Sequence, residues 1–141
     1  MIITAGEFKG QKIIAPDEKI TRPTLSKVRM AVFNTLQALT DFEDKSFFDM
    51  FAGSGIMGLE ALSRGFSRLT ACEKNNKVAG ILKSNYKKFT AARDIKLFTG
   101  DSLKIAKTLE PPYDVIYIDP PYFSGVYEES LNAVKHLGGI V

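Results

Sequence analysis

The sequence predicts an α/β fold in which helices cover both faces of a doubly wound, Rossmann-like parallel sheet. From residue 46 onward, short apolar runs alternate with segments of helical spacing. Buried strands that alternate with helices form an open parallel sheet with right-handed crossovers. The first apolar run leads into Gly53-Ser54-Gly55, a glycine-rich turn at the start of a helix, where such sheets commonly bind phosphates or nucleosides.

The composition is typical of one globular unit, because 141 residues with 45% hydrophobic content can bury a single ordinary core. No apolar run reaches 18 residues, and the N-terminus lacks the charged-then-apolar order of a signal peptide. We therefore expect a soluble, cytoplasmic protein without a membrane partner. Cys72 is the only cysteine, which excludes an intrachain disulfide and argues against a cysteine-based zinc site; we expect no metal.

The first part of the chain is predicted to precede the sheet as an appendage. The patterns of residues 1–6 and 11–16 indicate two short strands that the turn-prone residues between them join into a β-hairpin. A helix is expected over residues 24–39. Its inner face is predicted to carry Val28, Ala31, Val32, Leu36 and Leu39. We divide the chain into the hairpin, residues 1–23, and the main domain, residues 24–141.

Four strands and four helices alternate in the remainder of the chain. The strands are predicted over residues 46–51, 68–73, 95–101 and 113–119, and the helices over residues 56–65, 75–89, 102–109 and 126–137. Residues 138–141 indicate the beginning of a fifth strand. Because doubly wound nucleotide-binding sheets usually have six or more strands, we expect the last strands to be absent from this sequence and the main domain to be incomplete at its C-terminal end.

Positive charge is concentrated near the N-terminus. Residues 1–30 contain six Lys and Arg against three acidic residues, whereas the other 111 residues contain 13 of each sign. A basic segment beside a neutral domain is typical of a part that contacts RNA or DNA, since phosphate neutralisation gives affinity without sequence readout. The alternative is an ordinary solvated surface.

The glycine-rich turn and a carboxylate at the end of the next strand predict a ligand that contains a ribose. Residues 53–58 match G-x-G-x-x-G, in which glycine permits a tight turn and a close approach of the backbone. Asp49 and Phe51 end the strand before the turn, and Glu73 ends the next strand, where it can accept two ribose hydroxyls. NAD and S-adenosylmethionine both contain a ribose, so these features leave the two cofactors open.

Four carboxylates at strand ends favour S-adenosylmethionine. They are Asp49, Glu73, Asp101 and Asp119. With the strand order 3-2-1-4-5, the carboxyl ends of strands one and four flank the ligand crevice, which places Asp119 opposite the glycine turn. A sulfonium cofactor is positively charged and tolerates this acidic edge, whereas a pyrophosphate is repelled by it.

The most specific motif is Asp119-Pro120-Pro121-Tyr122. The two prolines fix the backbone and remove two donors, so nearby carbonyls are left as acceptors. The Asp119 carboxylate and a fixed carbonyl can together accept hydrogen bonds from both N–H groups of an exocyclic amino group. Tyr122 offers a ring on which a base can stack. The motif therefore predicts transfer of a methyl group to the amino group of a nucleobase.

These motifs resemble the bacterial 16S ribosomal RNA guanine-N2 methyltransferase family, which consists of class I S-adenosylmethionine-dependent methyltransferases with a D-P-P-Y motif. The resemblance rests on "DMFAGSGIMGLEALSRG", "ACEKN", "TGDS" and "VIYIDPPY". It also rests on the front end, where "ITAGEFKGQKI" and "TRPTLSKVRMAVFNTL" are similar to the hairpin and R-P-T segment of that family. The likeness covers essentially the whole chain.

The resemblance implies roles for individual residues. S-adenosylmethionine is expected to contact Asp49, Phe51, Gly53, Ser54, Gly55, Glu73, Asp101 and Ser102, with Glu73 on the ribose and Asp101 near the adenine amino group. The target guanine is expected to contact Asp119, Pro120, Pro121 and Tyr122. Substrate RNA is expected to contact Lys9, Lys12, Arg22 and Thr24, which makes the hairpin an RNA-contacting appendage.

The function that the resemblance implies is methylation of the N2 amino group of a guanine in 16S ribosomal RNA, after the base has been flipped out of the helix. The expected partner is 16S RNA in the small ribosomal subunit or an assembly intermediate, and the protein is expected to be a monomer. Three alternatives remain open: an amino-group methyltransferase acting on DNA adenine or cytosine, a non-catalytic nucleic-acid-binding remnant of the fold, and an NAD-dependent oxidoreductase.

Overall fold

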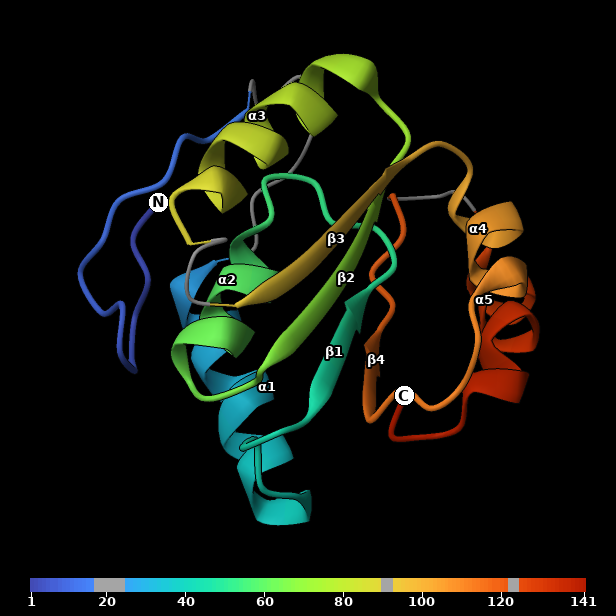
Figure 1. Cartoon of the computed structure of the whole chain (residues 1–141), viewed down its shortest axis with the longest axis horizontal. Coiled ribbons are helices and arrows are strands. Elements are labelled where there is room, and N and C mark those ends of the chain that lie inside the picture. The colour runs from blue at the N-terminus through green and yellow to red at the C-terminus, as the bar shows by residue number, and fades with distance from the viewer. Residues whose placement is uncertain (17–24, 90–92, 122–124) are drawn as a thin grey trace.

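The computed structural model describes residues 1–16, 25–89, 93–121 and 125–141. The centre of this part of the chain is a parallel sheet of β1 (Ser46–Asp49), β2 (Arg68–Glu73), β3 (Asp94–Thr99) and β4 (Val115–Tyr117). Its strand order is β3-β2-β1-β4 (Figure 1), which confirms the predicted order for these four strands. Ile140 forms an isolated parallel bridge with Val115, so residues near 140 lie beside β4 where a fifth strand is predicted.

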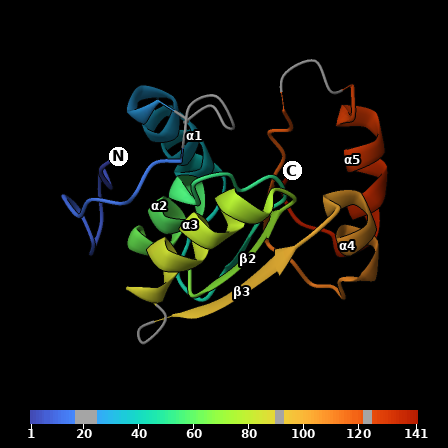
Figure 2. The same cartoon turned by 90° about the horizontal axis from the view of Figure 1, so that it is seen from above.

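Helices cover both faces of the sheet, as predicted (Figure 2). One face carries α1 (Ser26–Leu39), α2 (Ile56–Ser63) and α3 (Asn76–Lys87), and the other carries α4 (Ser102–Thr108) and α5 (Tyr127–Val134), which continues as a 3-10 turn over Lys135–Leu137. Asn75 caps α3, since its Oδ1 accepts hydrogen bonds from the N–H groups of Lys77 and Val78. Among the described residues, no helix is both long and apolar enough to cross a membrane.

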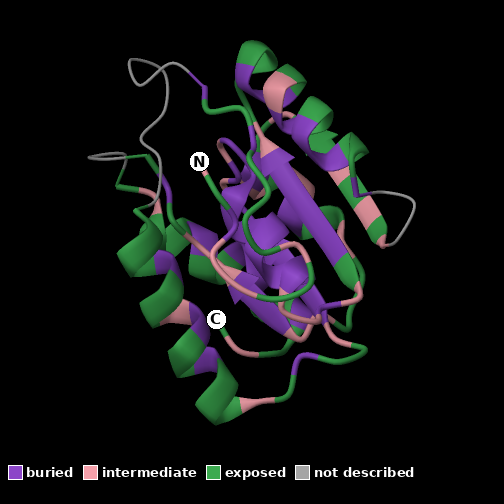
Figure 3. Cartoon of the chain, turned by 90° about the vertical axis from the view of Figure 1, so that its left-hand side faces the viewer, coloured by how far each residue is buried: buried purple, intermediate pink, exposed green. Residues whose placement is uncertain are grey.

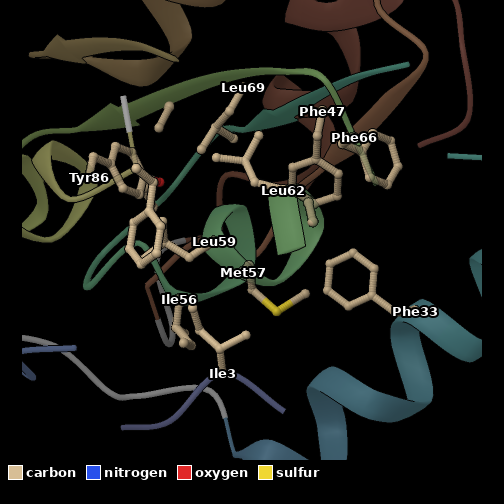
Figure 4. Packing of buried hydrophobic residues seen from close by; sticks show 14 of the residues in the cluster. Ile3, Phe33, Phe47, Ile56, Met57, Leu59, Leu62, Phe66, Leu69 and Tyr86 are labelled. Atoms are coloured by element: carbon tan, nitrogen blue, oxygen red, sulfur yellow. The ribbon is translucent and has the colours of Figure 1, made fainter. Parts of the chain in front are cut away.

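Side chains that alternate along the strands supply two hydrophobic cores. Phe47 and Leu69 pack with α1, α2 and α3, whereas Phe48 and Ile116 pack with α4 and α5. Because both faces of β1 are buried, its sequence is a continuous apolar run without alternation. The ring of Phe47 lies 5.3 Å from that of Phe66, on the side of the sheet where Leu62 of α2 packs (Figure 4). Buried residues gather at the centre of the molecule, and exposed residues lie on the outer faces of the helices (Figure 3).

The N-terminal segment, which we define as residues 1–14, does not form the predicted pair of strands. It contains one isolated antiparallel bridge, between Ile2 and Lys12. Its two halves do lie antiparallel, since the Ile3 N–H donates to the Gln11 carbonyl and the Ile13 N–H to the Met1 carbonyl, both at 3.0 Å. The pairing does not extend into strands because other backbone groups bond to α2: the Thr4 N–H donates to Glu60 Oε1 at 2.6 Å, and the Glu7 N–H donates to the Ser63 carbonyl at 2.8 Å. Ile3 and Ile13 are buried in the same core as α1 and α2. The division at residue 23 stays a prediction, because residues 17–24 lie outside the described part.

The predicted inner face of α1 is right in part. Leu36 is buried and Val32 is half-buried against the core, as predicted. Val28 and Leu39, however, are 46% and 62% exposed, and Arg29 and Phe33 are buried in their place. The helix is rotated from the predicted face because the Nε atom of Arg29 lies 3.4 Å from Oε1 of the fully buried Glu60. A buried carboxylate stays ionised only when it is paired, and Arg64 supplies a second partner with its Nε atom 3.3 Å from Oε2.

Candidate functional site

The glycine loop, residues 52–55, connects β1 to α2 at the carboxyl edge of the sheet. The Gly55 N–H donates to the Ala52 carbonyl at 2.9 Å and closes a turn, while the Ala52 N–H donates to the Cys72 carbonyl of β2 at 2.9 Å. Gly53 and Gly55 have φ angles of 56° and 85°, the left-handed region that glycine enters without steric cost. The loop therefore needs glycine at both positions.

Two glycines also provide space for close packing. A methyl group at Gly55 would lie 2.1 Å from Cδ1 of Leu82, and one at Gly58 would lie 2.7 Å from Cδ2 of Leu69. Tyr86 of α3 sits against both positions; it is labelled near Ile56 and Leu59 in Figure 4. Gly58 thus lets α2 approach β2 closely, the role of the third glycine in a dinucleotide-binding fingerprint.

Glu73 stands beside the glycine loop, at the end of β2. Its Oε2 accepts a hydrogen bond from the Gly53 N–H at 2.9 Å, and its Oε1 accepts one from the Asn75 N–H at 3.1 Å. An ionised carboxylate has about four lone-pair sites, so acceptor capacity remains for ligand hydroxyls. The Glu73 carboxylate therefore positions the glycine loop and lies with it at the carboxyl edge of the sheet. Its contact with a ribose stays a prediction.

Asp49 is a buried carboxylate at the end of β1. Among the described residues, neither of its carboxylate oxygens has a hydrogen-bond partner. The pKa of Asp49 is raised from 3.8 to about 8, chiefly by burial and also by the negative charges of Asp119 and Glu73, while the nearby backbone N–H of Phe51 acts in the opposite direction. The structure therefore brings Asp49, Glu73 and Asp119 within electrostatic reach of one another, as the acidic edge requires.

The raised pKa of Asp49 predicts that stability depends on pH. The unfolded carboxyl ionises near pH 4 and the folded one near pH 8, so its contribution is fully present below pH 4 and is lost as the pH rises to 8. Asp49→Asn is expected to weaken this dependence and to unfold at a higher urea concentration than wild type at pH 8. Urea unfolding at pH 5 and pH 8 measures this, with exposed Asp94→Asn as control. A variant as pH-dependent as wild type would contradict the assignment.

Asp119 follows β4, and because β4 pairs with β1 in parallel, it lies near the end of β1. The Met50 N–H donates to the Tyr117 carbonyl at 3.1 Å, which joins the two strand ends. The Tyr117 hydroxyl donates to Asp119 Oδ2 at 3.4 Å. Asp119 is exposed, Pro120 is buried and Pro121 is exposed. Tyr122, the last residue of the motif, lies outside the described residues.

Asp101 has a structural task in addition to its predicted one. Its Oδ1 accepts a hydrogen bond from the Leu103 N–H at 2.9 Å and caps α4, whose first residue is the buried Ser102. The Gly100 N–H donates to the Glu73 carbonyl at 2.9 Å, so Asp101 follows the end of β3 beside that of β2. It is not among the charges that shift the pKa of Asp49. Phe51, half-buried, packs against the core of α4 and α5.

The predicted RNA contacts fall into two groups. Lys9 and Lys12 are exposed on the N-terminal segment. Arg22 and Thr24 lie outside the described residues. Contact of any of these four residues with RNA stays a prediction.

Sequence reasoning missed Asn85, a fully buried amide on α3. Its Nδ2 donates to the carbonyls of Ile14 and Ser54, and its Oδ1 accepts from the Ile14 N–H. The available signal was its place on the inner face of the helix, three positions after Leu82, where a polar residue interrupts an apolar stripe.

The residues at this edge fit S-adenosylmethionine better than a dinucleotide. The negative charges of Glu73 and Asp119, with the unpartnered buried carboxyl group of Asp49 between them, suit a cationic ligand and oppose a pyrophosphate. The glycine loop lacks the side chains that would obstruct close approach of a ligand to its backbone. Among the described residues, no group of three or more His, Cys, Asp or Glu side chains is arranged to hold a metal ion.

Comparison with known proteins places the whole chain in one family. Residues 1–140 match the family described as conserved hypothetical protein 95. The chain is 32% identical over 136 residues to ribosomal RNA small subunit methyltransferase D of Escherichia coli (strain K12), covering 96% of this chain and 67% of that protein. It is 33% identical to the protein of the same name from Buchnera aphidicola (strain APS), over 95% of this chain and 69% of the relative.

Solved structures share the fold. The structure of yhhF from Escherichia coli aligns with a TM-score of 0.85 and 29% identity, over 100% of this chain and 75% of that chain. Precorrin-6y C5,15-methyltransferase from Geobacter metallireducens GS-15 aligns with a TM-score of 0.69 and 28% identity, over 90% of this chain and 63% of that chain. The four-stranded sheet with its helices is thus the core of a class I methyltransferase fold.

Proposed function

Since the chain belongs to the family described as conserved hypothetical protein 95, we propose that it transfers a methyl group from S-adenosylmethionine to the exocyclic N2 amino group of a guanine in 16S ribosomal RNA. The observation that carries the proposal is the likeness to ribosomal RNA small subunit methyltransferase D, which extends over 96% of this chain and 67% of that protein. A ribosomal substrate would place the protein in the cytoplasm, as a monomer acting on the small subunit or an assembly intermediate.

The cofactor is proposed to lie along the carboxyl edge of β1 and β2. S-adenosylmethionine supplies, when bound, a methyl group attached to a positively charged sulfonium. Glu73 is proposed to accept the ribose hydroxyls, while Asp101 and the Ser102 backbone read the adenine. Asp49 and Phe51 border the cofactor next to the glycine loop. Support comes from the cluster of carboxylates, because the negative charges of Glu73 and Asp119, beside the buried carboxyl group of Asp49, attract a cation.

The target base is proposed to be held by the D-P-P-Y motif at the end of β4. The Asp119 carboxylate and the Pro120 carbonyl accept hydrogen bonds from the two N–H groups of the guanine N2 amino group and turn its lone pair toward the methyl position. Pro121 fixes the backbone, and Tyr122 stacks on the base. The N2 nitrogen is a weak nucleophile because its lone pair is delocalised into the ring, so positioning is expected to supply much of the rate enhancement. A guanine within a helix must first be flipped out.

The first test is methyl transfer from labelled S-adenosylmethionine to small ribosomal subunits that lack the modification, and in parallel to naked 16S RNA and to DNA. The RNA is digested to nucleosides, and the products are identified by mass. N2-methylguanosine from wild type, and none with Asp119→Ala, is the expected result. Methyladenine or methylcytosine in the DNA sample would instead support a DNA amino-group methyltransferase. Cofactor binding without any product would support a non-catalytic nucleic-acid-binding protein.

A further inference from the structure

Asn85 joins two parts of the molecule that are distant in sequence. It lies on the inner face of α3, which runs beside the N-terminal segment (Figure 1). Its Nδ2 donates to the Ile14 carbonyl at 2.8 Å and to the Ser54 carbonyl at 3.1 Å. Its Oδ1 accepts from the Ile14 N–H at 2.8 Å. One fully buried amide therefore bonds both to the N-terminal segment and to the glycine loop.

The bond to Ser54 acts on the turn itself. It holds the carbonyl of the peptide unit between Ser54 and Gly55, whose N–H donates to the Ala52 carbonyl at 2.9 Å. The orientation of this peptide unit sets the left-handed conformation of Gly55, with a φ of 85°. Asn85 therefore holds one side of the peptide unit on which the glycine loop depends.

The bonds to Ile14 and to Ser54 depend on each other. If residue 14 moved away, Asn85 would lose two of its three hydrogen bonds while still buried, and a buried amide without partners is costly. The amide would then be free to turn, and its hold on the Ser54 carbonyl would weaken. Conversely, a ligand that fixes the loop fixes the amide and so favours the seated position of Ile14.

We propose that Asn85 is a positioning residue that couples the seating of Ile14, at the end of the N-terminal segment, to the shape of the glycine loop, so that cofactor binding and the seating of Ile14 stabilise each other. This inference rests on the proposed binding of S-adenosylmethionine at the loop. By linkage, the coupling is reciprocal: if cofactor binding favours the seating of Ile14 by some factor, the seating of Ile14 raises the affinity for the cofactor by the same factor.

Amide hydrogen exchange of the wild-type protein tests the coupling without any substitution. The two reporters are the N–H of Ile14, bonded to Asn85, and the N–H of Phe8, which donates to Ser63 Oγ at 2.9 Å. Saturating S-adenosylhomocysteine is expected to slow exchange at Ile14 at least about fivefold more than at Phe8, the low end of typical coupling factors. Equal slowing at both amides, or none at Ile14, would overturn the inference.

A matched pair of variants separates coupling from simple loss of stability. Asn85→Ala removes the amide, whereas Ser63→Ala removes a hydroxyl that bonds the segment at Ala5 and Phe8 but does not touch the loop. By calorimetric titration, Asn85→Ala is expected to raise the Kd for S-adenosylhomocysteine about tenfold and Ser63→Ala less than about threefold. The selective protection of Ile14 should also disappear in Asn85→Ala. Equal loss of affinity in both variants would contradict the proposal.

The outcomes distinguish this inference from the proposed function. Failure of wild type to bind S-adenosylhomocysteine would overturn the cofactor assignment and the coupling with it. Binding without selective protection of Ile14 would overturn only the coupling. If Asn85→Ala does not fold, the exchange measurement on wild type still shows whether the cofactor protects Ile14 selectively.

Discussion

Asp119→Ala is expected to lower the rate of methyl transfer at least about 100-fold while leaving the affinity for S-adenosylhomocysteine within a few-fold of wild type. The proposed role of Asp119 is to accept a hydrogen bond from the target amino group, an interaction that alanine cannot make. The carboxylate is exposed at the end of β4, so its removal leaves the core intact. Single-turnover transfer to small subunits and calorimetric titration of S-adenosylhomocysteine measure the two quantities separately.

Two further variants sharpen this prediction. Asp119→Asn keeps one acceptor oxygen without the charge and should retain more activity than alanine. Tyr117→Phe removes the hydroxyl that donates to Asp119 Oδ2 and should cost about tenfold, since a hydrogen bond to a charged group contributes about 1.5–3 kcal/mol and this one, at 3.4 Å, is long. If Asp119→Ala weakened cofactor binding as much as transfer, the carboxylate would belong to the cofactor site instead.

Gly55→Ala is expected to destabilise the protein by roughly 2–5 kcal/mol, the sum of about 1–2 kcal/mol for a left-handed backbone and about 1–3 kcal/mol for overpacking. The added methyl would stand 2.1 Å from Cδ1 of Leu82 and 2.7 Å from Cε1 of Tyr86. Such a loss is a large part of the total stability of a domain, about 5–15 kcal/mol. Urea unfolding followed by circular dichroism gives the difference, and cofactor affinity should fall with it.

Gly80 supplies the matched control for this substitution. It lies within α3, and a methyl group there would meet no heavy atom within 4 Å. Gly80→Ala should therefore stabilise the protein, by up to about 1 kcal/mol, because alanine has the higher helix propensity. If Gly55→Ala were as harmless as Gly80→Ala, the close packing of the glycine loop against α3 would be refuted.

Local pattern was sufficient to predict much of the fold. The bounds of β2 agree with the prediction at both ends, because the buried run from Leu69 to Cys72 is bordered by charged residues. Only part of the inner face of α1 could be found in this way. Periodicity counts apolar residues, whereas Arg29 is drawn inward by Glu60, 31 positions away. Likewise, the predicted pairing in the N-terminal segment is limited by hydrogen bonds to Glu60 of α2 and Asn85 of α3, which are distant in sequence.

In the site, too, local pattern predicted some features, whereas contacts between distant residues set others. Asp49, Glu73 and Asp119 were predicted together because the carboxyl ends of adjacent parallel strands share one edge. Asp101 was assigned to that edge as well, but no strand pattern reveals that its carboxylate also caps α4. Asn85 was missed because its partners, Ile14 and Ser54, are 71 and 31 positions away. A polar residue in an apolar stripe indicates a buried hydrogen bond without naming its partner.

The strand order has a consequence for synthesis on the ribosome. β1 is central, yet its partners on the two sides emerge at different times: β2 follows shortly, whereas Ser46 of β1 and Asp114, just before β4, are 68 positions apart. At about 5–20 residues per second, one edge of an apolar strand stays open for roughly 3–14 s in the nascent chain. An unpaired edge is a template for association with other chains. The nascent protein thus passes through an interval in which aggregation competes with completion of the sheet.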